Sequence, residues 1–164
     1  MNALLKLPVP ETRPKNSPQA RKKIMLVDDD SAIRQMLARL LTGEGYDMLL
    51  AVSGSEAVRV VRAADIDLVL LDLNMPGMDG WETFEKLATE NPLLPIVVIT
   101  ARPNQSFTAL AAGIGALLEK PLDLPKLFRT IRGLLDEPDE VRLARVAGRP
   151  SEFHYVPPKA AGLG

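Results

Sequence analysis

Short apolar runs alternate along this chain with longer amphipathic segments. The runs lack the strict alternation of a half-exposed strand, as expected for parallel strands that are covered on both faces. In two of the intervening segments, apolar residues recur at the spacing of a helix that packs one face on a sheet. The predicted strands are 24–27, 47–52, 67–71, 95–99 and 116–118. The helical stripes are Ile33, Met36, Leu37, Leu40 and Leu41, and Leu127, Phe128, Ile131, Leu134 and Leu135.

This order of elements predicts an α/β fold. A βα unit repeated five times gives a doubly wound, five-stranded parallel sheet with helices on both faces. Helix start signals agree, because Ser53 and Asp79 each lie three residues before a glutamate. Asp123 is a further cap candidate, with Pro125 in the first turn of its helix. The helical pattern is weakest at 105–112.

Proline-rich segments flank the alternating region. We interpret residues 1–22 as a flexible extension and residues 137–164 as a Pro/Gly-rich tail with a short helix-forming piece at 140–146. The folded domain then spans residues 23–136. With 164 residues, 46% of them hydrophobic, the chain is long enough for one core but hardly for two.

Composition narrows the function classes. The formal net charge of -1 provides no overall field for a polyanion, so we expect no direct nucleic-acid binding. The absence of cysteine excludes disulfides, thiolate catalysis and cysteine metal sites. No apolar stretch is long enough to span a bilayer, and the first residues have too short an apolar core for a signal peptide. We therefore expect a cytoplasmic protein without membrane insertion.

Polar side chains follow four of the five predicted strands. Asp28 and Asp29 follow the first strand, Asp72 the third, Thr100 the fourth and Lys120 the fifth. The carboxyl ends of parallel strands meet at one sheet edge, where ligands bind in open α/β folds. Clustered carboxylates repel unless a cation compensates, and Mg²⁺ suits a shallow, hydrated carboxylate site. A lysine and a hydroxyl there could stabilise a phosphoryl group carried by a carboxylate nucleophile.

Each of these residues also has a simpler structural interpretation. Residues 28–30 could form a solvated turn that caps the first helix. Thr100 could cap the segment that follows it, and Lys120-Pro121 could end a strand at a turn. Their occurrence together, in order and at one edge, favours a functional site.

Four motifs in this order resemble the receiver domain of two-component response regulators, with its chemotaxis-regulator-like, flavodoxin-like fold. The resemblance covers about residues 23–136. The motifs lie at residues 24–30, 70–80, 99–101 and 119–121.

The resemblance implies a role for each acidic position. Asp72 would be the phosphoacceptor. Asp29 would be the principal carboxylate ligand of Mg²⁺, and Asp28 would assist through the water shell of the metal. Asp72 and the backbone carbonyl of Asn74 would complete the metal site.

The resemblance also implies a switch and its partners. Thr100 would be the hydroxyl that moves to the phosphoryl group, and Lys120, beside a cis bond to Pro121, would pair with its oxygens. The phosphoryl donor would be a histidine kinase or a histidine phosphotransfer protein, and the output would pass to a downstream protein target. The domain would not be an enzyme beyond assisting its own phosphorylation and dephosphorylation. Whether phosphorylation produces a homodimer stays open.

Two positions depart from the family pattern. An aromatic residue is usual three positions before the lysine, where this chain has Leu117. The segment from Thr100 to Lys120 is about two residues shorter than the commonest pattern, so we expect the surface formed by the fourth helix and fifth strand to differ.

Three alternatives to a phosphorylatable receiver remain. The chain could be the regulatory fragment of a longer DNA-binding regulator or hybrid kinase. It could be an aspartyl-phosphate phosphohydrolase, although such enzymes usually carry an acid two positions after the nucleophile, where this chain has Asn74. It could also be a pseudo-receiver that binds a partner constitutively.

Overall fold

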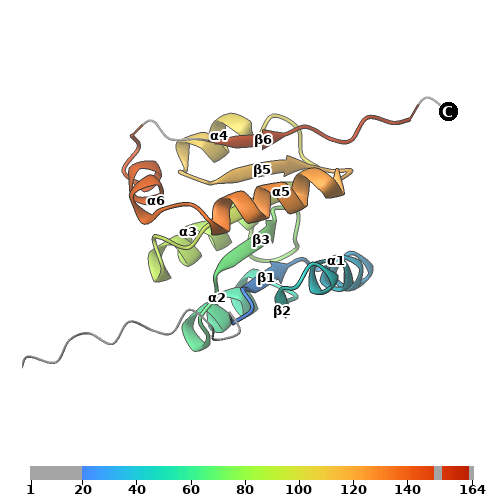
Figure 1. The fold of residues 1–164 in the computed structure, drawn as a ribbon, viewed down its shortest axis with the longest axis horizontal. Helices are drawn as coiled ribbons and strands as arrows, with labels where there is room; N and C mark the ends of the chain where they lie inside the picture. Colours follow the sequence, from blue (N-terminus) through green and yellow to red (C-terminus); the bar gives the residue numbers. More distant parts are fainter. Residues whose placement is uncertain (1–19, 150–152, 163–164) are drawn as a thin grey trace, which may run out of the picture.

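All strands of the structure lie in one parallel sheet with the order β2-β1-β3-β4-β5-β6 (Figure 1). The computed structural model describes residues 20–149 and 153–162. Within these ranges the sheet has six strands, one more than predicted. They are β1 (Lys23–Val27), β2 (Asp47–Ala51), β3 (Leu68–Asp72), β4 (Ile96–Thr100), β5 (Ala116–Glu119) and β6 (His154–Val156).

Helices cover both faces of the sheet, as predicted. Two of them, α1 and α5, contribute leucines and isoleucine to one core cluster, while α2, α3 and α4 pack on the opposite face. The fold class expected from the sequence is therefore confirmed. The helices are α1 (Ser31–Gly43), α2 (Gly54–Ala63), α3 (Gly80–Glu90), α4 (Ser106–Ala111), α5 (Leu124–Leu135) and α6 (Asp139–Val146).

The sheet register brings the ends of the central strands level. Val27 of β1 pairs with Leu71 of β3, so the residues that follow each of them reach the same edge. Thr100 of β4 pairs with Glu119 of β5, which places Lys120 one step beyond the sheet. The three central strands are fully buried along most of their length. This rigid, apolar support holds the polar residues at its carboxyl end.

Most of the predicted helix caps are present. The Ser53 side chain accepts a hydrogen bond from the amide of Glu56 at 3.2 Å, and Asp123 accepts one from the amide of Lys126 at 3.2 Å. Asp79 occupies the cap position of α3, but its side chain makes no capping hydrogen bond. It forms an ion pair with Arg102 at 3.5 Å, so α3 begins at the predicted position but without a side-chain cap.

The chain beyond α5 contributes α6 and β6 to the folded unit. The short helix expected at 140–146 is present as α6, whereas β6 was not predicted. Residues 1–19 of the extension predicted over 1–22 lie outside the described residues. No helix in the described part of the chain is both long and apolar enough to cross a membrane.

Candidate functional site

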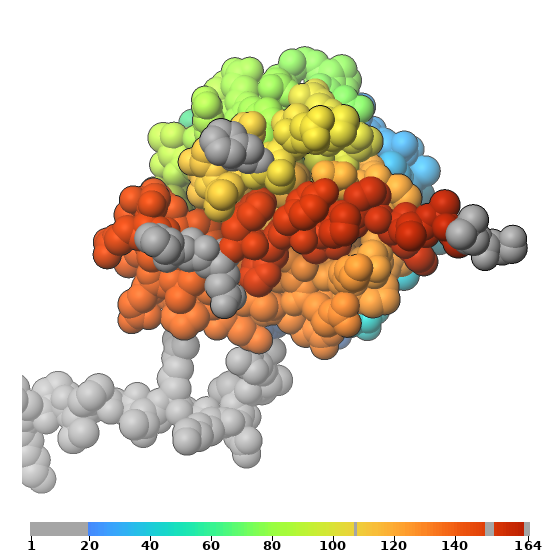
Figure 2. Space-filling view, turned by 90° about the horizontal axis from the view of Figure 1, so that it is seen from above, coloured from blue at the N-terminus to red at the C-terminus, as the bar shows by residue number. Residues whose placement is uncertain are grey.

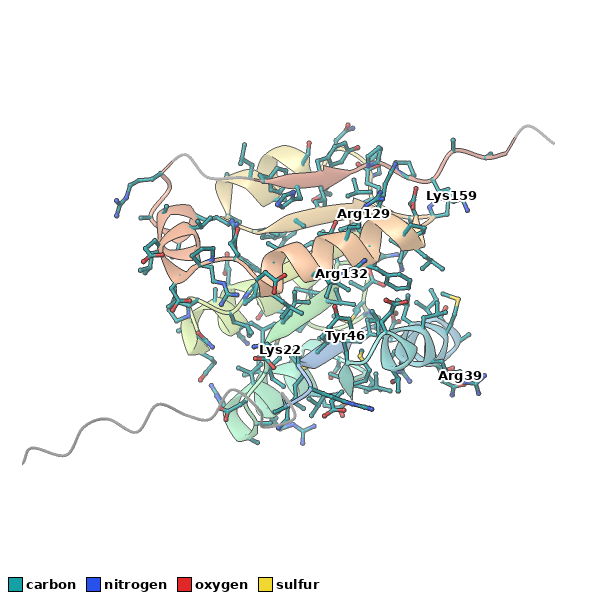
Figure 3. The ribbon with its side chains drawn as sticks, in the orientation of Figure 1. Lys22, Arg39, Tyr46, Arg129, Arg132 and Lys159 are labelled. Atoms are coloured by element: carbon teal, nitrogen blue, oxygen red, sulfur yellow. The ribbon has the colours of Figure 1, made fainter. Side chains whose placement is uncertain are left out.

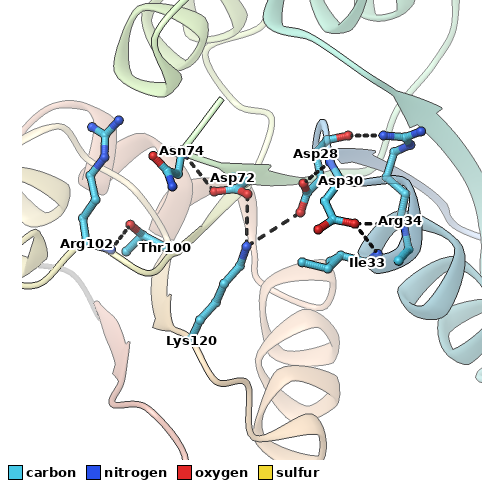
Figure 4. Close-up of polar contacts among 10 residues, drawn as sticks. Asp28, Asp30, Ile33, Arg34, Asp72, Asn74, Thr100, Arg102 and Lys120 are labelled. Carbon is cyan, nitrogen blue, oxygen red and sulfur yellow. Dashed lines mark hydrogen bonds and ion pairs between the residues drawn. The ribbon is translucent and has the colours of Figure 1, made fainter. Parts of the chain in front are cut away.

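The carboxyl ends of β1, β3, β4 and β5 bring the predicted site residues to one edge of the sheet (Figure 4). Asp28 directly follows β1, and Asp72 is the last residue of β3, the neighbouring strand. Lys120 directly follows β5, and its side chain reaches past β4 to both carboxylates. The strand order therefore assembles a site from residues that are far apart in the sequence.

Three carboxylates form a compact acidic cluster. One oxygen from each of Asp28, Asp29 and Asp72 lies within 4.8 Å of the other two. Asp28 and Asp72 are buried, with 2% and 4% of their surface exposed, and Asp29 is exposed. Two buried acids and one exposed acid make an oxygen-ligand set that is open to water on one side, which fits a hard divalent cation such as Mg²⁺.

Lys120 is the positive charge in this cluster. Its Nζ atom donates to Asp72 Oδ2 at 3.1 Å and lies 3.8 Å from Asp28 Oδ2. The lysine side chain is itself 22% exposed. One ammonium group facing three acids leaves the site with a net negative charge, which favours a further cation.

The buried position of Asp28 makes its ionised form unfavourable. Burial raises the pKa of Asp28 to about 6, and the neighbouring Asp72 contributes to the increase. The backbone amide of Asp30 and the charge of Lys120 act in the opposite direction on this pKa. The amide of Asp30 donates to Asp28 Oδ1 at 2.9 Å. The folded protein therefore holds Asp28 in place even though it disfavours its charged form.

Asp72 is positioned by two hydrogen bonds, one to each carboxylate oxygen. The amide of Asn74 donates to Oδ1 at 2.8 Å, and Lys120 donates to Oδ2 at 3.1 Å. Both donors fix the orientation of the carboxylate, and a carboxylate oxygen is a group that can act as a nucleophile. Asn74 thus lies beside Asp72, while the metal-site role of its backbone carbonyl stays a prediction.

Thr100 is fully buried at the end of β4. Its Oγ1 atom accepts a hydrogen bond from the amide of Arg102 at 2.9 Å, so the hydroxyl does stabilise the turn that follows it. Its carbonyl accepts from the amide of Lys120 at 2.8 Å, which joins the two predicted switch residues through the backbone. The bond between Lys120 and Pro121 is cis, as the sequence resemblance implied.

The simpler interpretation of the acidic turn holds for one residue. Asp30 caps α1, because its side chain accepts hydrogen bonds from the amides of Ala32 and Ile33 at 2.9 Å and 3.2 Å. Asp28 points instead toward Lys120, and Asp29 joins the carboxylate cluster. Capping therefore explains only the third acid of the run.

Sequence reasoning missed two supporting contacts of the site. The guanidinium of Arg34 donates to the carbonyl of Asp28 at 2.7 Å and so supports the loop from the side of α1. The indole of Trp81 donates to the side chain of Gln105 at 3.1 Å, which ties α3 to the start of α4. One signal in the sequence could have suggested the role of Arg34: it is a positive charge in the first turn of a helix that directly follows a run of acidic residues.

The two departures from the family pattern have structural counterparts. Leu117 is fully buried in the core, and the fourth helix has only six residues. Tyr155 of β6 pairs with Leu117 in the sheet register. Its hydroxyl donates to Glu119 Oε1 at 2.8 Å. The surface beside β5 is thus covered by the C-terminal part of the chain.

Comparison with known sequences identifies one family. Residues 24–132 match the model of the response regulator receiver domain. The chain is 40% identical over 122 residues to the response regulator MprA of Mycobacterium leprae, an alignment that covers 72% of this chain and 54% of MprA. The chain spans between about a quarter and a half of the length of the curated relatives it matches.

Solved structures give the same result. A CheY-like response regulator receiver domain protein from Methanospirillum hungatei superimposes with a TM-score of 0.68 at 32% identity. That match covers 74% of this chain and 98% of the other. The response regulator TrrA from Thermotoga maritima, solved in complex with Mg²⁺-BeF, gives a TM-score of 0.63 at 29% identity, with 69% and 98% of the two chains covered.

Proposed function

Because this chain belongs to the response regulator receiver domain family of two-component signalling proteins, we propose that it is a phosphorylatable switch whose phosphoacceptor is Asp72. The observation that carries the proposal is the position of Asp72: it is buried at the end of a central strand, in contact with Lys120 and within 4.8 Å of two further carboxylates. Asp28 shares the burial and the neighbouring carboxylates, but Lys120 donates a hydrogen bond to Asp72 at 3.1 Å, whereas it lies 3.8 Å from Asp28.

The proposed reaction is a phosphoryl transfer. A carboxylate oxygen of Asp72 attacks the phosphorus of a phosphohistidine, a P–O bond forms, and the P–N bond breaks. The imidazole leaves with the electron pair of that bond and takes up a proton. The two hydrogen bonds to Asp72 hold the carboxylate oriented for this attack.

Mg²⁺ fits the acidic cluster in this proposal. Asp28, Asp29 and Asp72 would hold it, with the backbone carbonyl of Asn74 as a further oxygen ligand. Supporting this, the three carboxylates already converge, and the related TrrA was solved with Mg²⁺-BeF. When bound, the ion supplies positive charge for the oxygens of the transferred group.

Thr100 and Lys120 would bind the phosphoryl oxygens. The Lys120 ammonium is placed at Asp72 Oδ2 and needs little movement to reach an oxygen on a phosphorylated Asp72. The Thr100 hydroxyl accepts a hydrogen bond from Arg102 and still has its own proton to donate. These contacts would assist phosphorylation and dephosphorylation of the domain itself, which is the extent of its catalysis.

The proposal extends to partners and boundaries. The phosphoryl donor would be a histidine kinase or histidine phosphotransfer protein, and the output would be altered binding to a protein target in the cytoplasm. Residues 23–136 would form the receiver, with residues 1–22 as an extension and residues 137–164 as a tail whose β6 joins the receiver sheet. The family match favours this function over the phosphohydrolase alternative.

A small phosphodonor tests the proposal. Acetyl phosphate with Mg²⁺ should add one phosphoryl group to the full chain, as seen by intact mass. We expect the Asp72→Asn variant to gain none, and chelation of Mg²⁺ to abolish the gain. Asp139→Asn, the same change at an exposed acid of α6, is the matched control and should be phosphorylated normally. Equal phosphorylation of Asp72→Asn and the wild type would refute the proposal.

A further inference from the structure

The outer edge of β5 is occupied by the C-terminal part of the same chain. His154, Tyr155 and Val156 pair in parallel with Ala116, Leu117 and Leu118. The amide of His154 donates to the carbonyl of Gly115 at 3.2 Å, and the amide of Lys159 donates to the carbonyl of Pro121 at 2.9 Å. The C-terminal segment, defined here as residues 153–159, therefore spans the whole length of β5 and the turn beyond it.

Side chains on both faces of the sheet hold this segment. Val156 is only 9% exposed and packs into the cluster formed with α1 and α5. Phe153 packs against the cluster on the opposite face. Figure 2 shows the segment as a continuous red band between α4, in yellow, and α5, in orange. An exposed strand edge is a template for another chain, and this edge is covered.

The segment also closes the sheet. Pro157 and Pro158 follow β6 directly and have no backbone N–H. They therefore cannot donate hydrogen bonds to a strand that pairs with the outer side of β6. The outer edge of the sheet is therefore the three-residue strand β6. Lys159 then lies near the start of α5 (Figure 3).

The same segment contacts the residues on either side of Lys120. Glu119, directly before it, accepts the hydroxyl hydrogen bond of Tyr155 at 2.8 Å. Pro121, directly after it, accepts the amide of Lys159. Lys120 itself binds Asp72. Lys120 is thus linked to the docked segment through one peptide unit on each side.

We propose that the β5 edge is a docking site for an extended parallel strand, that residues 153–159 of the same chain occupy it, and that this occupancy is coupled to the state of the Asp72 site. The coupling rests on the proposed function, whereas the docking does not. Because coupling between two sites is reciprocal, release of the segment must also change the affinity of the Asp72 site for its ligand.

Hydrogen exchange of the His154 and Lys159 amides measures docking in the full chain. Val156→Asp places a charge at a buried contact and should speed exchange of both amides at least tenfold. Ala160→Asp adds the same charge to an exposed residue of the same tail and should leave exchange unchanged. Unprotected amides in the wild type would overturn the docking. Exchange that depends on protein concentration would assign the strand to a second copy and overturn occupancy within one chain.

Beryllofluoride with Mg²⁺, as a phosphoryl mimic, measures the coupling. We expect it to change exchange at the two amides at least threefold, in either direction, and to bind Val156→Asp with an affinity different from that of Ala160→Asp. If beryllofluoride binds but changes amide exchange by less than twofold, and if the two variants bind it with affinities within twofold of each other, the coupling is overturned. The proposed function would then stay intact. Failure of beryllofluoride to bind the wild type would contradict the proposed function and the coupling together, and the docking would still be decided by hydrogen exchange of the two amides without beryllofluoride.

Discussion

At the scale of single residues, the site is a set of charges that only partly compensate each other. Asp28 and Asp72 are buried side by side, and within the described part of the chain Lys120 is the one ammonium group that forms ion pairs with both. Desolvation is the largest contribution to the raised pKa of Asp28, so the fold tolerates this carboxylate at a cost in stability. A residue kept at such a cost is more simply explained by ligand binding than by folding.

The cost at Asp28 predicts a pH-dependent stability. In metal-free buffer at neutral pH, Asp28→Asn should raise the free energy of unfolding by about 1–3 kcal/mol, because the amide keeps the acceptor for Asp30 without a charge to bury. The pKa of Asp28 is raised from 3.8 to about 6, so ionisation destabilises the folded state fully above that value. The gain should shrink as the pH falls through about 6 toward 4. Urea unfolding across this range checks it, and a gain that grows on acidification would contradict it.

The position of Lys120 in the acidic cluster predicts that its ammonium group competes with a bound cation. Lys120→Met removes an ammonium group that lies 3.1 Å from Asp72, and this group repels any cation in the cluster. We expect Mg²⁺ to bind the variant about tenfold more tightly, as measured by calorimetric titration. The response to beryllofluoride, followed by Trp81 fluorescence, should be weaker than in the wild type. Weaker Mg²⁺ binding in the variant would show that the lysine organises the cluster rather than competing with a cation.

At the scale of elements, the start of α3 is packed closely on the loop that follows β3. A Cβ atom added at Gly80 would lie 2.4 Å from the Cα atom of Leu73, which is backbone and cannot move aside without shifting the loop. The loop carries Asn74, the residue that orients Asp72. Close packing of α3 therefore helps to position Asp72, the proposed phosphoacceptor.

This packing predicts opposite effects for two glycine substitutions in helices. Gly80→Ala should lower the free energy of unfolding by about 1–3 kcal/mol through overpacking. Gly133→Ala in α5 meets nothing within 4 Å and should raise it by about 0.5–1 kcal/mol, because alanine favours a helix over glycine. Thermal unfolding of both variants provides the comparison. Equal effects of the two substitutions would contradict the packing argument.

The elements also show what can be predicted from the sequence. The five core strands and the stripes on α1 and α5 follow from periodicity, because buried parallel strands and one-sided helices leave clear apolar patterns. β6 leaves none, since three residues among prolines and glycines owe their strand conformation to an existing edge. The start of α3 after Asp79 also follows from the capping pattern, whereas the ion pair of the Asp79 side chain with Arg102 is a tertiary contact that this pattern does not record.

At the scale of the whole molecule, strand order is what makes the site. The order β2-β1-β3-β4-β5 places the ends of β1 and β3 together and brings β5 within reach of both. The motifs at these strand ends could therefore be predicted to meet once a parallel sheet was inferred. The contacts of Arg34 and Tyr155 could not, because they depend on tertiary packing that no local pattern records.

The central claim is that Asp72 receives the phosphoryl group. The most direct measurement treats the Mg²⁺-phosphorylated full chain with borohydride, which reduces an aspartyl phosphate to homoserine, and locates the converted residue by peptide mass spectrometry. We predict conversion at position 72 alone. Conversion at Asp28 or Asp29, or phosphorylated protein with no converted aspartate, would contradict this account.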